Sequence, residues 1–211
     1  MKTHDFIDLL VAEPTPRWSF QSRFGLMTTC GVVATAVTFF LVAGLRPDLS
    51  QAMESLRFLF KFVVTLALAV TATGAALRMG DPSRTMHRWA WALACVPTLL
   101  AVSAIVELGA TPNDAWLARL VGHTAWRCVT LIPLLSIGPL ACLLLALRHG
   151  APARPGLAGA VAGLAASGIA ATFYAANCTD DSPLFVATWF SLATLIVTAT
   201  GYLAGRKFLI W

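Results

Sequence analysis

Two of the five cysteines fall where the chain could carry out redox or metal chemistry. Cys128 opens an apolar stretch and Cys178 lies in a short polar segment, whereas Cys30, Cys95 and Cys142 lie inside long apolar runs. A thiol inside an apolar run usually behaves as a small, buried, inert hydrophobe. We therefore expect Cys128 and Cys178 to be the functional pair.

The chemistry open to this pair depends on whether the two thiols meet. A disulfide requires alpha carbons about 4.4 to 6.8 Å apart, which two segments at one end of a helical bundle can achieve. One interpretation is an inert structural disulfide. The other is a switchable pair that is oxidised by peroxide-like agents or bridged by a soft metal ion.

The segment around Cys178 is acidic and also begins a helix. Asp180 and Asp181 are expected to raise the pKa of the Cys178 thiol by charge repulsion. Asp181, Ser182 and Pro183 form a helix start, with Ser182 as the cap and Pro183 at the first helical position.

The residues before Cys128 predict the opposite effect. Arg127 and His123 are expected to lower the pKa of Cys128, which makes it the better nucleophile. Trp126 lies near the end of an apolar run, as an aromatic belt requires. We expect His123 and Trp126, together with the helix start after Cys178, to support a sensor loop.

Several enzyme classes lack their motifs in this sequence. There is no C-x-x-C pair for a disulfide-forming enzyme, and no predicted membrane span contains a histidine for a haem. No phosphate-binding glycine loop, zinc-protease motif or serine nucleophile elbow occurs. We expect neither an enzyme nor a bound cofactor.

The elements that position the cysteines are membrane spans. Of the 211 residues, 58% are hydrophobic and only 12% are charged, which is typical of a bilayer protein. Runs of about 20 apolar residues predict an all-α bundle of six transmembrane helices with short loops. The expected spans are 25–45, 58–77, 89–109, 129–147, 157–176 and 184–204.

The distribution of Lys and Arg predicts the orientation of the bundle. Ten of the 15 fall in the N-terminal segment, the 78–88 and 148–156 loops and the tail, and five fall toward the other face. Both termini are therefore expected in the cytoplasm of a multi-pass inner-membrane protein. Orientation explains the net charge of +5, so no nucleic-acid partner is expected. The expected organisation is a cytoplasmic segment 1–24, a membrane domain 25–204 and a cytoplasmic tail 205–211.

The N-terminal segment contains a short amphipathic pattern over residues 3–13, ended by prolines. One interpretation is a helix that lies on the inner leaflet of the membrane. The other is a helix that docks its apolar side chains into a groove of a soluble partner. The residues expected to make that contact are Phe6, Ile7, Leu9 and Leu10.

Two ionisable residues fall inside predicted spans, namely Lys61 and Glu107. Such residues mark ion pathways, but here a mutual ion pair or contact with the interface is the favoured interpretation. In the first outer loop, Arg46 and Asp48 are positioned to pair.

The fourth and fifth spans differ in composition. Pro133 and Pro139 each remove a backbone donor from the fourth span and are expected to bend it. Gly159, Gly163 and Ser167 recur at four-residue spacing in the fifth span, which favours close packing of a neighbouring helix.

The motifs together resemble those of the NrsF family over essentially the whole chain. The resemblance is carried by the MKTxDxIxxL start, GLRPDL after the first span, Trp126-x-Cys128, an Arg-Pro step into the fifth span, Cys178 followed by Asp181-Ser182-Pro183-Leu184-Phe185 and Trp189, and a basic tail ending in Trp211. The family pattern often has His before the second cysteine and Pro-Glu after it, where this chain has Asn177 and Thr179-Asp180.

This resemblance implies an integral inner-membrane anti-sigma factor. Members of the family hold an extracytoplasmic-function sigma factor at the membrane and release it under oxidative or heavy-metal stress. Their two functional outer cysteines correspond to Cys128 and Cys178. The alternatives from the residues alone are a small transporter for metal ions or thiol compounds, with Lys61 and Glu107 on its path, and a structural subunit of a larger membrane complex.

Overall fold

The structure is a computed structural model that describes residues 19–81 and 87–209. The predicted N-terminal helix, with Phe6, Ile7, Leu9 and Leu10, lies outside the described residues.

Long apolar helices make up most of the described chain. Six helical segments there are long and apolar enough to cross a membrane, and no strand occurs among these residues, which confirms the all-α prediction. They are α2 (Phe20–Val42), α4 (Leu56–Met79), α5 (His87–Ala110), α7 (Ala125–Arg148), α8 (Pro155–Ala175) and a last segment made of α9 (Pro183–Phe185), the π-helical turn η2 (Val186–Phe190) and α10 (Ser191–Phe208). Three short helices lie between them: α3 (Leu49–Ala52), η1 (Asn113–Ala115) and α6 (Trp116–Val121).

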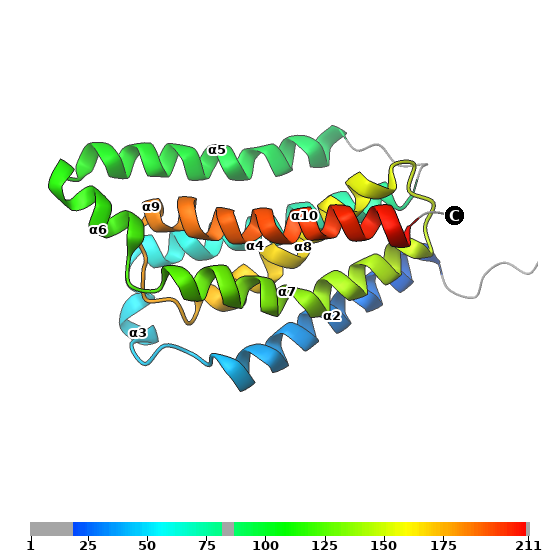
Figure 1. The fold of residues 1–211 in the computed structure, drawn as a ribbon, viewed down its shortest axis with the longest axis horizontal. Coiled ribbons are helices and arrows are strands. Elements are labelled where there is room, and N and C mark those ends of the chain that lie inside the picture. The colour runs from blue at the N-terminus through cyan, green and yellow to red at the C-terminus, as the bar shows by residue number, and fades with distance from the viewer. Residues whose placement is uncertain (1–18, 82–86, 210–211) are drawn as a thin grey trace, which may run out of the picture.

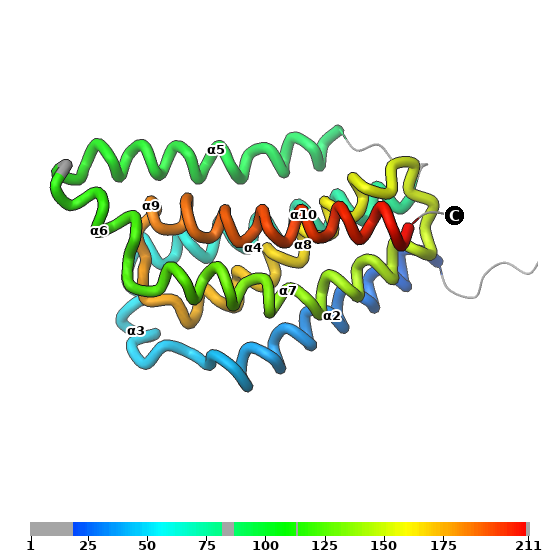
Figure 2. The backbone as a smooth tube through the Cα atoms, in the orientation of Figure 1, coloured from blue at the N-terminus to red at the C-terminus, as the bar shows by residue number. Residues whose placement is uncertain are grey.

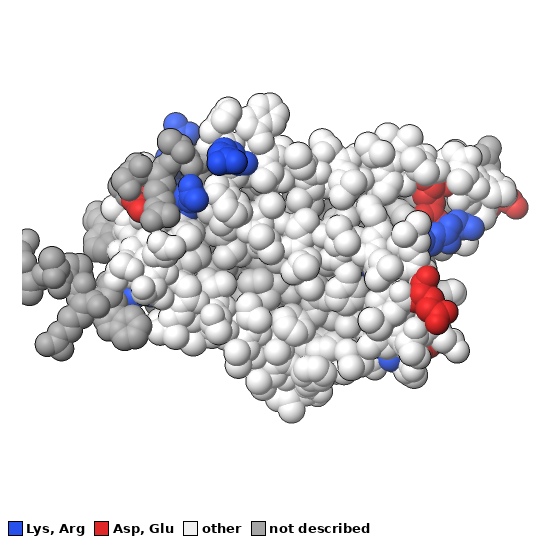
Figure 3. Space-filling view, turned by 180° about the vertical axis from the view of Figure 1, so that it is seen from behind, with Lys and Arg blue, Asp and Glu red and all other residues white. Residues whose placement is uncertain are grey.

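The bundle has two distinct ends. Helix α2 begins and α10 ends at the same end, which we call the terminal end (Figure 1). The opposite end carries residues 43–55, 111–124 and 176–182, and we call it the loop end. Charged side chains gather at the two ends and leave a broad uncharged band between them, as the face in Figure 3 shows. This distribution is that of a membrane-spanning bundle.

Helix α8 is the centre of the bundle. It is the most buried of the six spans and packs against α4, α7 and α10. A Cβ atom on Gly159 would lie 2.2 Å from the carbonyl oxygen of Gly201, and one on Gly168 would lie 2.6 Å from the backbone nitrogen of Ala69. Backbones that approach this closely tolerate only small residues. The predicted packing role of the small-residue stripe is therefore confirmed.

Helices α2 and α7 meet at the second proline of α7. A Cβ atom on Gly31 would lie 2.8 Å from the Cα of Pro139. Proline lacks an N–H, so Pro139 leaves the carbonyl of Leu135, four residues earlier, without its helical donor. The Thr35 hydroxyl of α2 donates to that carbonyl oxygen at 3.3 Å. The neighbouring helix thus compensates the donor that the proline removes.

Helix α5 lies at the edge of the bundle (Figure 2). Only Val96 and Glu107 are buried among its residues, and its side chains contact mainly α4 and the start of the last span. Cys95 of α5 and Cys30 of α2 are exposed on the outside of the bundle, and Cys142 is partly buried. The expectation that all three are buried was wrong for the first two, because the outer face of a membrane bundle is itself apolar.

Candidate functional site

The structure brings Cys128 and Cys178 together at the loop end. Cys128 lies in the first turn of α7 and Cys178 in the loop after α8, and both are fully buried within one apolar cluster. The Cys128 thiol lies close enough to Cys178 to lower the pKa of the Cys178 thiol, and both are free thiols. The pair therefore has the proximity that a disulfide requires.

Two hydroxyl groups that the sequence did not single out complete the surroundings of the thiols. The Sγ atom of Cys128 lies 3.5 Å from the hydroxyl of Tyr174, which is fully buried. The Sγ atom of Cys178 lies 3.5 Å from the hydroxyl of Thr124 and 3.6 Å from the backbone oxygen of Asp180. Tyr174 precedes Cys178 by four residues and Thr124 precedes Cys128 by four, so both come from the ends of the same two helices.

The loop that carries Cys178 is fastened to the outer end of α2. The amide of Asn177 donates to the carbonyl oxygens of Ala43 and Gly44 at 3.2 and 3.1 Å. The backbone nitrogen of Arg46 donates to the carbonyl oxygen of Ala176 at 3.1 Å. These hydrogen bonds join segments that are far apart in the sequence, and they hold the loop against α2.

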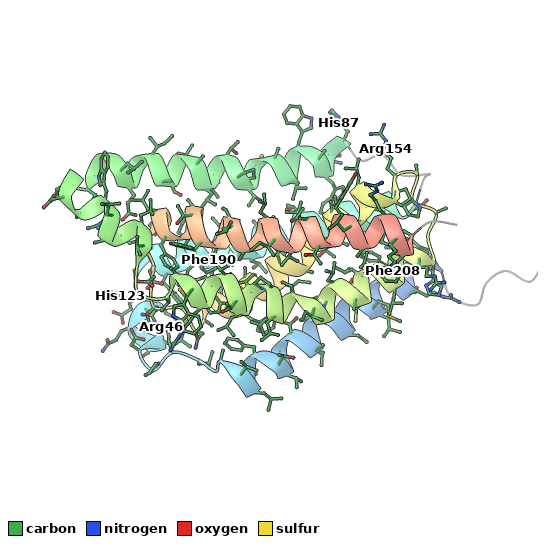
Figure 4. All side chains as sticks on the ribbon, in the orientation of Figure 1. Arg46, His87, His123, Arg154, Phe190 and Phe208 are labelled. Carbon is green, nitrogen blue, oxygen red and sulfur yellow. The ribbon has the colours of Figure 1, made fainter. Side chains whose placement is uncertain are left out.

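Two cations converge on the backbone of Cys178. Lys61 Nζ donates to its carbonyl oxygen at 2.9 Å, and Arg46 Nη1 donates to the same oxygen at 3.3 Å. Both cations also bind the carboxylate of Asp181, one to each oxygen. Figure 4 shows Arg46 at the loop end, near His123.

Arg46 also pairs with Asp48, as the sequence predicted. Its Nε and Nη2 donate to the two carboxylate oxygens of Asp48 at 2.7 and 2.6 Å. This fork-shaped contact lowers the pKa of Asp48 to about 2, and the two carboxylates together raise the pKa of Arg46. Arg46 therefore stays charged beneath the loop.

The carboxylate of Asp180 is bound to the start of α7. Its Oδ2 accepts from the backbone nitrogens of His123 and Thr124 at 3.0 and 2.9 Å, and from the Thr124 hydroxyl at 2.6 Å. These donors open the helix that carries Cys128, so Asp180 caps α7 from another part of the chain.

The electrostatic prediction for Cys178 was wrong. Its thiol pKa is lowered, chiefly by the hydrogen bond from Cys128 and then by the positive charge of Lys61, although burial acts in the other direction. The two neighbouring acids do not raise the pKa of Cys178, because Asp180 is bound to the start of α7 and Asp181 is neutralised by Lys61 and Arg46. Cys178 is therefore the thiol favoured as the nucleophile.

The two ionisable residues inside the spans do not pair with each other. Lys61 is fully buried and binds Asp181, whereas Glu107 of α5 binds Arg119 at 2.8 Å and Arg57 at 3.4 Å. Of the two alternatives considered, the mutual ion pair is therefore not formed, and the full burial of Lys61 also excludes its contact with the interface.

The helix start after Cys178 was predicted in position but not in every bond. Pro183 is the first residue of α9, as expected, and Ser182 is the residue before it. The Ser182 side chain does not cap the helix but lies 3.4 Å from Glu107 Oε1. The loop is thereby linked to α5 as well.

The other two predicted supporting residues contribute less. His123 takes part through its backbone nitrogen, which donates to Asp180. The Trp126 side chain is 67% exposed on the outside of the bundle, where the Arg127 guanidinium lies over its ring. Trp189, from the start of the last span, instead reaches the loop end, and its indole donates to the Leu120 carbonyl at 2.8 Å.

The donor set at the site is two thiols. Among the residues that the structure describes, no three or more His, Cys, Asp and Glu side chains are grouped so that they could hold a metal ion. The arrangement can therefore form a disulfide, and it offers a soft ion two sulfur atoms only.

Comparisons with known proteins agree on one family. A family model described as "NrsF: Negative regulator of sigma F" matches residues 11–211. The anti-sigma-F factor NrsF of Caulobacter vibrioides is 34% identical, and the probable anti-sigma-F factor NrsF of Azospira oryzae is 31% identical, each over the full length of both chains. No solved structure matches the chain significantly. With a match that extends from residue 11 to the last residue, and two full-length relatives above 30% identity, this chain belongs to the NrsF family of negative regulators of sigma F.

Proposed function

We propose that this protein is an inner-membrane anti-sigma factor that binds a sigma factor of the extracytoplasmic-function class and releases it when Cys128 and Cys178 are oxidised. The sigma factor is held through the N-terminal segment 1–24, whose apolar residues Phe6, Ile7, Leu9 and Leu10 form the contact. Both termini lie in the cytoplasm, and the loop end faces the opposite compartment.

The observation that carries the proposal is the close approach of two buried thiols within one apolar cluster, one at the start of α7 and one in the loop after α8. Two relatives named as anti-sigma-F factors support the regulatory part. The loop of Cys178 is tied to the end of α2 by Asn177, and α2 begins at Phe20, within the proposed binding segment. A change at the thiols therefore has a physical connection to that segment.

The sensing reaction is a two-electron oxidation. A hydroperoxide accepts two electrons and two protons from the thiols and becomes water and an alcohol, while one S–S bond forms. The site favours this signal over a metal ion, because it offers a metal only two thiols and these already lie next to each other. Bridging by a soft metal ion is the second signal that the experiment includes.

The energetics of such a switch are demanding. Moving a protein from mostly bound to mostly released needs about 5.5 kcal/mol of differential stabilisation. A disulfide typically contributes about 2 to 4 kcal/mol. We infer that the bound arrangement is only modestly more stable than the released one before oxidation, or that the concentration of the partner adds to the free energy of release.

A pull-down of the detergent-solubilised protein tests the proposal. The full-length chain should retain a sigma factor, identified by peptide mass spectrometry, and a variant without residues 1–18, which leaves α2 complete, should not. Hydrogen peroxide should release the partner from the wild type but not from Cys128→Ser or Cys178→Ser. Cys95→Ser, which changes an exposed thiol far from the pair, is the matched control.

Two results would contradict the proposal. If the full-length chain retains no sigma factor, the regulatory function is excluded. Flux of metal ions into reconstituted vesicles would then favour the transporter. Release by Cd²⁺ but not by peroxide would exclude oxidation as the signal.

A further inference from the structure

Helix α4 contains one lysine, Lys61, and its side chain is fully buried. A buried ammonium group is costly unless its three protons have acceptors. The acceptors are the carbonyl oxygen of Cys178 at 2.9 Å, that of Asp180 at 3.4 Å and the carboxylate of Asp181. Every acceptor belongs to the loop of Cys178, so the hydrogen bonds of the Lys61 ammonium group all hold this loop.

These contacts fix the direction of the Cys178 side chain. The carbonyl oxygens of Cys178 and Asp180 both accept from the one ammonium group, and the Asp180 oxygen also lies 3.6 Å from the Cys178 sulfur. Cys128 and Thr124 are the other neighbours of that sulfur. Lys61 thus holds the backbone on which the thiol is positioned.

The titratable and charged groups around Cys178 come from several elements. The neutral ones are Cys128 of α7 and Tyr174 of α8. The charged ones are Lys61 of α4, Arg46 after α2, and Asp180 and Asp181 of the loop itself. Asp180 is bound to the start of α7, and Arg46 is shared between Asp48 and Asp181, whereas Lys61 has Asp181 as its one carboxylate partner and lowers the pKa of Cys178. Lys61 is therefore the cation whose charge acts most directly on the thiol.

We propose that Lys61 is the positioning residue that sets the reactivity of Cys178, by holding the loop backbone and by supplying the positive charge against which the thiolate forms. This inference deepens the proposed function, since it names the group that prepares the sensor thiol. The geometry of three loop acceptors on one buried ammonium carries it, and the lowered pKa of Cys178 agrees with it.

The test measures alkylation of Cys178 by iodoacetamide as a function of pH. In this reaction the thiolate sulfur forms a bond to carbon and iodide leaves, so the rate follows the fraction of thiolate. The protein is full-length, in detergent, with Cys30, Cys95 and Cys142 changed to Ala, and the modified peptide is quantified by mass spectrometry. No sigma factor is present.

Lys61→Met removes the charge and keeps the length of the side chain. We expect the pH of half-maximal rate to rise by about one unit or more, with about a tenfold slower reaction at about pH 5, below both midpoints. Lys61→Arg should restore the wild-type profile. Arg57→Met is the matched control, because Arg57 lies one turn earlier on α4, is half exposed and binds Glu107 rather than the loop.

A second variant keeps the inference testable if Lys61→Met fails to fold. Asp181→Asn removes the anion that competes for Lys61, so the half-maximal pH should fall. An unchanged midpoint in Lys61→Met, whatever the absolute rate, would show a packing role only and overturn the inference, as would a rise in Asp181→Asn.

The outcome is separable from that of the proposed function. If the shifts occur while no sigma factor is retained in the pull-down, the proposed function fails and the role of Lys61 stands. If peroxide releases a sigma factor while Lys61→Met keeps the wild-type midpoint, only the role of Lys61 fails.

Discussion

Asp180 and Thr124 are joined by two hydrogen bonds, one from the Thr124 backbone nitrogen at 2.9 Å and one from its hydroxyl at 2.6 Å, both to the same carboxylate oxygen. The contact connects the loop of Cys178 to the first turn of the helix of Cys128. It keeps the two thiols in register, and the same Thr124 hydroxyl lies 3.5 Å from the Cys178 sulfur.

Replacing Asp180 by Ala should destabilise this end of the bundle. The change leaves the donors of His123 and Thr124 without their acceptor, which costs about 2 kcal/mol. Thermal unfolding in detergent measures the loss. Asp114→Ala, an exposed acid in the neighbouring loop, is the control and should have little effect. Equal losses in the two variants would contradict the capping role.

The contact between α8 and α10 predicts a severe steric effect. Gly159→Leu should destabilise the fold by about 3 kcal/mol or more, because its Cβ would meet backbone atoms of Gly201 and Gly205 that cannot move independently. Gly109→Leu on α5 is the matched control, since nothing lies within 4 Å of the Cβ that it would add. Size-exclusion chromatography after heating compares the two, and a folded Gly159→Leu protein would refute this packing.

Glu107 should hold α5 to the loop end. Glu107→Gln weakens the contacts to Arg119 and Arg57 and should cost about 1 to 2 kcal/mol. Hydrogen exchange should increase in α6, which contains Arg119. Glu54→Gln changes an exposed acid at the same end and should leave exchange in α6 unaltered. Unchanged exchange in Glu107→Gln would show that α5 is held by apolar contacts alone.

The lowered pKa of Cys178 predicts a pH-dependent stability. Its value in the folded protein is about 6, and an unfolded thiol has a pKa of about 8.5. Within this window the unfolded chain binds more protons, so stability rises with pH. The contribution is complete above about pH 8.5 and is lost as the pH falls through the folded value.

Melting curves of the reduced protein test this sign. The melting temperature of the wild type relative to Cys178→Ser should increase from pH 6 to pH 8.5, whereas Cys95→Ser should follow the wild type throughout. A difference between wild type and Cys178→Ser that stays constant, or shrinks, with pH would contradict a lowered folded pKa.

The membrane spans were predictable because their signal is local. Each run of apolar residues is long enough by itself to become a helix, and α4, α5 and α8 coincide with their predicted spans to within a few residues. The short helices α3 and α6 and the π-helical turn at Val186–Phe190 were not predicted. They depend on contacts with distant residues, such as the bond from Trp189 to Leu120, which no local pattern reveals.

The candidate site was predictable only in part for the same reason. Cys128 and Cys178 could be selected by their positions at the ends of apolar runs. The direction of the pKa shift of Cys178 was assigned wrongly, because the two acids next to it in sequence are bound by other groups, while Lys61, 117 residues away, lowers the pKa. Tyr174 could have been found by its spacing, since a residue four positions before Cys178 lies one helical turn below it.

The close approach of Gly31 to Pro139 has a mechanical consequence. We infer that this contact resists translation of α2 along α7 and is the point about which α2 tilts. That point lies partway along α2, with the arm to Asn177 on one side and the arm to Phe20 on the other. A sideways displacement of one arm therefore tilts the other in the opposite direction, as a lever does about its fulcrum.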